Sequence, residues 1–414
     1  MADYKEIRKT LHEHPQTAGN EQFAHDMIVK HLQGLHPTKV YTHVGGYGVI
    51  AVWESKDSHN HAITQSRNLP TIAFRADTDA LPIGHRCGHD GHTTILLRLA
   101  ELVDSLECVV GSTNGQMLPT THYPLSTHNI LLLWQPAEET GTGSRAVLES
   151  GILQQYNIKA FYALHNLPGY PLGTVVLCPR TFAAASTGVV YHLDGRETHA
   201  STPELGINPG LAIAEIIQRF SKFNNHPPSA KSINPDNWIS GLPRSGEDSE
   251  FRQSTLICVR VGEPAFGTSA GHGEVMFTLR AFTNSEMERL LADANQAVDE
   301  IAARYGLTVS RSLVEPFRAT ENNPNCVEAI KKAVENIYAS ANFHLSPFTL
   351  HLKEEPFRWS EDFAEYLLHF PGAMFGIGSG EDHAELHHPS YDFPDELIEP
   401  AAQLFFKLAT TGLD

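Results

Sequence analysis

Apolar runs of strand length recur along this chain, and amphipathic segments that suit helices separate them. Residues 71–75, 129–134 and 159–164 are such runs, and residues 92–106 place their apolar side chains on one helical face. Strands that alternate with helices predict an α/β domain in which helices cover a layered sheet. In such sheets ligands collect at the carboxyl ends of the strands, so the polar residues that follow the runs are candidate site residues.

The same patterns predict the remaining elements. In the first 184 residues, helices are expected at 3–14, 20–35, 92–106 and 144–149, and strands at 40–43, 48–53, 71–75, 129–134, 159–164 and 174–178. The next block has strands at 188–193, 255–261, 275–282 and 308–314 and helices at 209–223 and 285–305. From about residue 315 the first pattern returns, with helices at 325–339, 361–369 and 396–410 and a strand at 373–377.

These blocks predict two domains, because 414 residues exceed what one hydrophobic core usually supports. We predict a discontinuous α/β domain, residues 1–184 and 315–414, with a smaller α+β domain inserted at residues 185–314. The mixture of strands and helices in the insertion suits an antiparallel sheet. The polar stretches 55–68 and 224–252 are predicted to be loops.

Charge and cysteine content narrow the class of protein. With 30 basic and 48 acidic residues the formal net charge is −18, which argues against a nucleic-acid or anionic-membrane partner. The five cysteines are odd in number and widely spaced, so we expect free thiols in a reducing compartment rather than a disulfide framework. No apolar leader is visible at the N-terminus, and no run approaches the roughly 20 residues of a membrane helix. We therefore expect a cytoplasmic protein.

The most informative segment is Cys87-Gly88-His89-Asp90-Gly91-His92, which lies directly before a predicted helix. Its glycines permit a sharp turn, and its thiol, imidazole and carboxylate groups are the donors that a borderline divalent metal prefers. Taken alone, the segment also fits a turn with a buried cysteine and an aspartate that caps the helix.

Paired carboxylates follow two of the apolar runs. Asp77 and Asp79 come after the run 71–75, where they could orient metal-binding histidines. Glu138 and Glu139 come after the run 129–134. Adjacent acids at a turn point in different directions, so one can bind metal while its neighbour handles a proton. Taken alone, the aspartate pair fits a solvated turn about equally well, and the glutamate pair is better explained as a surface pair.

Histidines extend this pattern to two further strands. His165 follows the run 159–164, and His387 follows the predicted strand 373–377, with His388 as a competing candidate. Candidate ligands therefore follow several different predicted strands. On an open α/β sheet such residues meet at the carboxyl ends of the strands, where they can form a single metal site.

Together these motifs resemble the metallopeptidase family that contains aminoacylases and zinc carboxypeptidases. The most similar branch is the amidohydrolases typified by hippurate hydrolase and auxin-conjugate hydrolases. The resemblance covers nearly the whole chain and rests on Asp77-Thr78-Asp79-Ala80-Leu81-Pro82, the turn 87–92, Gln135-Pro136-Ala137-Glu138-Glu139, His165-Asn166-Leu167-Pro168, the segment from Gly195 to His199-Ala200, Ser360-Glu361-Asp362-Phe363 and Leu386-His387-His388-Pro389. It implies a mixed-sheet catalytic domain like that of zinc peptidases, with an inserted dimerisation or lid domain.

The resemblance also implies roles for individual residues. Two divalent ions per subunit (zinc, manganese, cobalt or nickel) would be held by Cys87, His89, Glu139, His165 and His387, with Cys87 between them. Glu138 would be the general base. His199, in the inserted domain, would stabilise the oxyanion in the site of a partner subunit, which implies a homodimer formed through that domain. The alternative for His199, which we favour less, is a loop histidine without a catalytic role.

The expected reaction is hydrolysis of the amide bond in an N-acyl amino acid or small peptide. A dipeptidase, another exopeptidase or a biosynthetic N-deacetylase would share the same metal core, because substrate choice lies in pocket contacts. This chain has only Gly84-His85-Arg86 where relatives have a longer loop, and residues 264–273 lack the Asn-x-Ile-Pro motif of relatives. The acyl group and amino acid therefore stay open. A non-catalytic binding relative is disfavoured because no ligand or base is missing.

Overall fold

The computed structural model describes residues 2–55, 69–108, 128–224, 251–339 and 349–411. These residues form two compact units. The first unit contains Met1–Phe182, Thr320–Glu355 and Asp362–Asp414, and the second contains Ala183–Ala319 and Pro356–Glu361. The predicted loops at 55–68 and 224–252 lie almost entirely outside the described residues.

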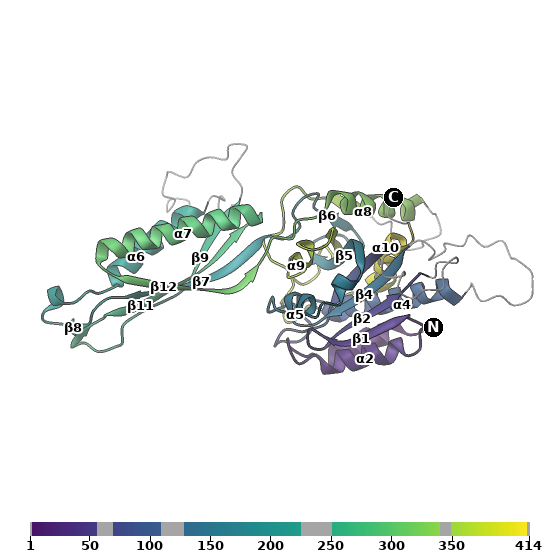
Figure 1. Ribbon diagram of the computed structural model, residues 1–414, viewed down its shortest axis with the longest axis horizontal. Coiled ribbons are helices and arrows are strands. Elements are labelled where there is room, and N and C mark those ends of the chain that lie inside the picture. The colour runs from purple at the N-terminus through teal and green to yellow at the C-terminus, as the bar shows by residue number, and fades with distance from the viewer. Residues whose placement is uncertain (1, 56–68, 109–127, 225–250, 340–348, 412–414) are drawn as a thin grey trace, which may run out of the picture. The chain divides into compact units, whose positions relative to one another are not determined.

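A mixed sheet forms the centre of the first unit (Figure 1). It has eight strands in the order β1-β2-β4-β3-β5-β14-β6-β13. The strands are β1 (Lys39–Val44), β2 (Gly48–Trp53), β3 (Pro70–Asp77), β4 (Asn129–Gln135), β5 (Asn157–Pro168), β6 (Val175–Leu177), β13 (Leu350–Leu352) and β14 (Gly372–Gly380). The central strands β4, β3, β5 and β14 are parallel to their neighbours in that series. Their carboxyl ends therefore lie at one edge of the sheet.

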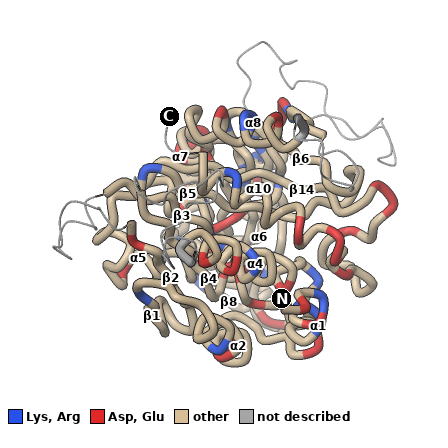
Figure 2. The backbone as a smooth tube through the Cα atoms, turned by 90° about the vertical axis from the view of Figure 1, so that its right-hand side faces the viewer, with Lys and Arg blue, Asp and Glu red and all other residues tan. Residues whose placement is uncertain are grey.

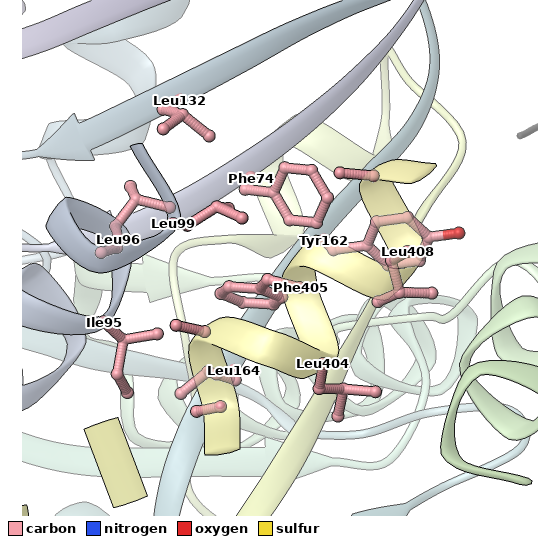
Figure 3. Close-up of a cluster of buried hydrophobic side chains, with 14 of the residues drawn as sticks. Phe74, Ile95, Leu96, Leu99, Leu132, Tyr162, Leu164, Leu404, Phe405 and Leu408 are labelled. Atoms are coloured by element: carbon pink, nitrogen blue, oxygen red, sulfur yellow. The ribbon is translucent and has the colours of Figure 1, made fainter. Parts of the chain in front are cut away.

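Helices cover both faces of this sheet. They are α1 (Tyr4–Glu13), α2 (Gln22–Leu32), α4 (His89–Cys108), α5 (Gly143–Glu149), α8 (Pro324–Ala339), α9 (Ala364–Leu367) and α10 (Ile398–Thr410). On one face α4 and α10 pack together over β3, β4 and β5, where their side chains interdigitate (Figure 3). On the other face Phe161 of β5 contacts the rings of Phe363 and Tyr366 beside α9.

The second unit is an α+β layer structure. Its antiparallel sheet has the order β12-β7-β11-β9 and contains β7 (Ala185–Asp194), β9 (Arg252–Val261), β11 (His272–Ala281) and β12 (Thr308–Phe317). A two-stranded ribbon pairs β8 (Thr198–His199) with β10 (Thr268–Ser269). Helices α6 (Gly210–Phe220) and α7 (Asn284–Tyr305) cover one face of the sheet (Figure 1).

The predicted fold class is confirmed, because the chain forms an α/β unit on a mixed sheet into which an α+β unit is inserted. The second unit contains the predicted insertion, residues 185–314, and extends beyond it to Ala319 and Pro356–Glu361. Within the described residues, no helix is long and apolar enough to span a membrane.

The helix predicted at residues 361–369 is wrong in its extent. The helix there is the short α9, Ala364–Leu367, and the Ser360 hydroxyl accepts a hydrogen bond from Arg280 instead of capping it. Asp362 precedes the helix because its carboxylate accepts hydrogen bonds from the side chains of Arg75 and Gln135 and from the Ser144 amide. These tertiary bonds override the local helical pattern.

A leucine of α10 tests the contribution of the main core. Leu404 is fully buried between α10 and the sheet, whereas Leu368 is 52% exposed at the end of α9. Leu404→Ala should lower the free energy of unfolding by about 2–5 kcal/mol, through lost apolar burial and the cavity left behind. The matched change Leu368→Ala should cost far less, and denaturant unfolding of the two variants measures the difference. Equal costs would mean that α10 is not packed as described.

Candidate metal centre

Side chains from the parallel strands gather at the edge where those strands end. Asp77 is the last residue of β3, Glu138 and Glu139 follow β4, and His165 lies near the end of β5. His387 follows β14 in a loop, and its backbone N–H donates to the carbonyl of Arg86 at 2.8 Å. The topology of the sheet thus collects residues separated by up to 310 positions in the sequence.

The turn at residues 87–88 depends on the absence of a side chain at Gly88. Gly88 has φ +92°, and a Cβ placed there would lie 2.7 Å from the side-chain amide of Asn166. The following Gly91, in the first turn of α4, lies against the ring of Phe393, 2.3 Å from where its own Cβ would stand. These glycines let the backbone approach the neighbouring strands closely, which places Cys87 and His89 at the sheet edge.

Cys87 contacts side chains from two distant parts of the chain. Its Sγ lies 2.5 Å from Oε1 of Glu139 and 2.9 Å from Nε2 of His387. One donor atom from each of Cys87, His89 and Glu139 lies within 4.8 Å of the others. Sulfur, imidazole nitrogen and carboxylate oxygen at this spacing suit a borderline divalent metal ion.

His89 provides the clearest test of whether this set fits a cation. Its Nδ1 donates to the backbone carbonyl of Asp79 at 2.9 Å, so Nε2 is the nitrogen that a metal ion could bind in place of a proton. This Nε2 is buried without a hydrogen-bond partner among the described residues, and it lies 3.9 Å from oxygens of both Glu138 and Glu139. Because this imidazole nitrogen and two carboxylates share a buried space, a metal ion that displaces the Nε2 proton fits between them.

His165 adds a further imidazole to the same cluster. Its ring stands 6.0 Å, centroid to centroid, from that of His89, and the two rings are nearly perpendicular at 78°. The Nδ1 of His165 donates to the carbonyl of Asn166 at 2.9 Å. This bond favours the tautomer in which Nε2 is the nitrogen that could bind a metal ion.

Asp79 holds the two glutamates in place. Its carboxylate accepts the backbone N–H of Glu138 at 3.1 Å and that of Glu139 at 3.0 Å. The preceding Ala137 has φ +54°, a conformation that costs energy in a residue with a Cβ, and its N–H donates to the buried Glu21 at 2.9 Å. The carboxylate of Asp79 thus orients the glutamate turn, while its carbonyl orients His89.

Asp77 belongs to a buried network that sequence reasoning did not identify. Its carboxylate accepts from Arg75 Nη1 at 2.6 Å and from His92 Nδ1 at 2.6 Å. Asn166 Oδ1 lies 2.6 Å from the other nitrogen of His92. The sequence does show Arg75 as a charged residue inside an apolar run. Its hydrogen-bond partners come from distant segments, so that run alone does not predict them.

Burial and neighbouring charges shift the pKa values of these groups in the metal-free protein. Burial raises the pKa of the Cys87 thiol far above its usual range. Burial alone would lower the pKa of His89, but the Asp77 carboxylate and nearby hydrogen bonds together hold it well above 6.5. Burial and the neighbouring His92 lower the pKa of His165. The pKa of Asp77 lies well below its usual value because His89, His92 and Arg75 outweigh the opposing effect of burial.

Two further histidines, one predicted and one competing, each contact a nearby serine. His199 is in the second unit, exposed on β8, and its Nδ1 lies 2.7 Å from the hydroxyl of Ser201. His388, the alternative to His387, is exposed and its Nδ1 lies 2.7 Å from the hydroxyl of Ser390. Of the adjacent pair His387 and His388, it is therefore the ring of His387 that contacts Cys87.

Comparison with known proteins places the chain in a family. Residues 73–411 match the sequence profile of peptidase family M20/M25/M40. The chain belongs to this family. The match spans most of the chain, so the resemblance inferred from the motifs is confirmed, and with it the assignment to a family of hydrolases.

Individual family members cover the chain almost from end to end. N-acetylcysteine deacetylase of Bacillus subtilis is 25% identical over 99% of this chain and 96% of its own length. N-acetyldiaminopimelate deacetylase of Lactobacillus acidophilus is 25% identical over 94% of this chain and 92% of its own. The crystal structure of a dinuclear metal-binding peptidase from Bacillus subtilis superposes with a TM-score of 0.74 at 22% identity, covering 99% of this chain and 97% of that one. The last likeness shows a shared fold.

The bonds of Asp79 predict how the glutamate turn responds to mutation. Asp79→Asn keeps the size of the side chain but replaces one acceptor oxygen with an amide that cannot accept, which leaves one buried N–H of the turn unpaired. We expect the free energy of unfolding to fall by about 1–3 kcal/mol, measured by denaturant unfolding without added metal. Asp26→Asn, an exposed change on α2, is the control and should have little effect. Identical unfolding curves for both variants would contradict the role given to Asp79.

Proposed function

We propose that this protein is a metal-dependent amidohydrolase that cleaves the amide bond of N-acyl amino acids or small peptides. The observation that carries the proposal is the buried Nε2 of His89, which has no hydrogen-bond partner among the described residues and lies 3.9 Å from carboxylate oxygens of Glu138 and Glu139. Two relatives of similar length are named as deacetylases of N-acetylated amino acids, which supports the class of substrate. The similar peptidase described as dinuclear supports a pair of metal ions.

The ions would be held by the five predicted ligands, which converge at the sheet edge. Cys87, within reach of both Glu139 and His387, would lie between the two ions; His89 and His165 complete the set. When bound, a pair of divalent cations lowers the pKa of water at the site and polarises the scissile carbonyl. Zinc, manganese, cobalt and nickel all suit this donor set, and their availability decides among them.

Glu138 is suited to move the proton in this reaction. Its carboxylate is largely buried, and Oε2 lies 3.9 Å from the unpartnered nitrogen of His89. Its backbone is fixed by Asp79, so the side chain starts from a defined position at the site. Glu138 would take a proton from the attacking water and deliver it to the nitrogen of the leaving amine, as a general base and then a general acid.

We also propose that the second unit forms a homodimer and that His199 acts in the site of the partner subunit. His199 is exposed on β8 of the second unit. Strand β9 is an edge of its sheet, and Leu256, Ile257, Val259 and Val261 along it are each at least 38% exposed. An exposed edge strand with apolar side chains favours association with another strand. His199 would there stabilise the negative oxygen that develops during hydrolysis.

The reducing compartment expected from the sequence also stays part of the proposal. Cys87, Cys178, Cys258 and Cys326 are all free thiols in the described residues. Free buried cysteines are typical of proteins that work in the cytoplasm, where thiols remain reduced.

Turnover of a substrate panel tests the proposed reaction. The metal-loaded protein should release free amino acid from some members of a panel of N-acetyl and N-benzoyl amino acids. Glu138→Gln should keep the metal content, measured by elemental analysis, and lower kcat by about 10²–10⁴-fold, because the amide cannot accept the proton. Glu149→Gln, an exposed change on α5, is the matched control. If the fully metal-loaded protein releases no amino acid from any member of the panel, the proposal is wrong. If Glu138→Gln keeps full activity, Glu138 is not the general base.

Mixing two inactive variants tests the shared site. If His199 completes the partner's site, His199→Ala and Glu138→Gln dimers should both be inactive. After subunit exchange, each mixed dimer would have one intact site, made of Glu138 from one chain and His199 from the other. Random exchange of equal amounts should then restore about a quarter of the wild-type activity. Exchange is verified separately by co-purification of differently tagged chains; exchanged dimers that stay inactive would show that His199 does not act across the interface.

A further inference from the structure

A second cluster of potential metal ligands lies on the inserted unit, on the sheet face opposite α6 and α7. His192 and Asp194 lie on β7, and His272 and Glu274 lie on the adjacent β11. The register pairs Glu274 with His192 and His272 with Asp194. Because side chains alternate along a strand, the neighbouring residues Tyr191, Leu193 and Val275 point into the core, and these four share the open face.

The donor atoms of this cluster are close together. Nδ1 of His192 lies 3.0 Å from Oε1 of Glu274, and Nε2 of His272 lies 3.9 Å from the same oxygen. One donor atom from each of the three residues lies within 4.8 Å of the others. Ligands on a tetrahedral ion with bonds of about 2.0–2.1 Å stand roughly 3.3–3.4 Å apart. The observed spacings bracket this value, so small side-chain rotations would bring the three donors onto one ion.

Neighbouring residues already hold the donors in a ligating orientation. The carboxylate of Asp194 accepts from Nδ1 of His272 at 2.7 Å, which leaves the lone pair of that imidazole on Nε2, the nitrogen that lies nearer Glu274. This is the arrangement by which carboxylates orient metal-binding histidines. Nη1 of Arg260 bonds the other oxygen of Glu274 at 3.2 Å and leaves Oε1 toward the histidines. The two imidazole rings stand 6.2 Å apart and nearly parallel, at 22°.

We propose that His192, His272 and Glu274 form a surface binding site for a divalent transition-metal ion, distinct from the cluster at Cys87. Two imidazoles and one carboxylate favour copper, zinc, nickel or cobalt, whereas calcium and magnesium require a shell of oxygens. The side chain of His272 is 53% exposed and that of His192 is 33% exposed, so an ion can enter from solvent. Binding would displace to solvent the proton between Nδ1 of His192 and Oε1 of Glu274. The bound ion would then link β7 to β11 through these side chains.

Metal stoichiometry tests the site in the full-length protein, with Zn²⁺ as the probe. Wild-type protein, His272→Ala and Glu274→Gln are dialysed against the same small excess of Zn²⁺, and bound zinc is counted by elemental analysis. The cluster at Cys87 is unchanged in all three, so each variant should hold about one ion per chain fewer than wild type. His36→Ala is the control, because His36 is also an exposed histidine bonded to an aspartate, Asp104, but has no second imidazole in that contact.

A residue-resolved measurement supplies an independent readout. Diethylpyrocarbonate modification, followed by peptide mass spectrometry, should show that Zn²⁺ protects His192 and His272 in wild-type protein while His36 reacts at the same rate with and without zinc. In Glu274→Gln this protection should be lost or weakened. Equal zinc content in wild type and both variants, or unchanged modification of His272 when zinc is added, would overturn the site.

Discussion

A single buried guanidinium ties together the elements on which the candidate metal centre stands. Arg75 is almost fully buried in β3, and it donates to Gln135 of β4, to Asp77 at the end of its own strand and to Asp362 before α9. A buried charge is tolerated only when it is paired and hydrogen-bonded, so these partners are fixed as a set. Asp77, which Arg75 holds in place, in turn accepts a hydrogen bond from His92. A second group of charged residues lies near α1, as the backbone trace in Figure 2 shows. There Arg8 of α1 donates a hydrogen bond to Asp90 in the first turn of α4.

The cluster at Cys87 contains several features that lower the stability of the folded protein. Ala137 and His387 adopt positive φ angles, and the pKa of Cys87 is raised by burial. His89 keeps a buried nitrogen without a partner in the described residues. Local strain and unpaired polar atoms persist where the surrounding structure holds them, and they concentrate at functional sites. The clamp formed by Asp79 supplies that support, because it fixes the glutamate turn and the ring of His89 together.

Much of the fold could be predicted because the strands and helices have clear periodicity and distinct boundaries. The helix at α4 was expected because its apolar residues repeat at helical spacing, and its start at His89 lies three residues before the predicted one. The prediction failed at Ser360 and Asp362, where a polar segment resembles a helix start. Tertiary bonds from Arg75 and the Ser144 amide decide the conformation there, and no local pattern contains them.

The kinds of side chain needed for metal chemistry could be read from the sequence, because a thiol, imidazoles and carboxylates follow successive apolar runs. The alternation of strands with helices also predicted that these side chains would share one edge of a sheet. The contacts of Cys87 with Glu139 and His387, and the support that Asp79 and Arg75 give the site, are visible in the folded protein alone. The tertiary structure alone also brought His192 and His272 side by side. Such contacts depend on strand order and register, which distant segments set together and no single segment encodes.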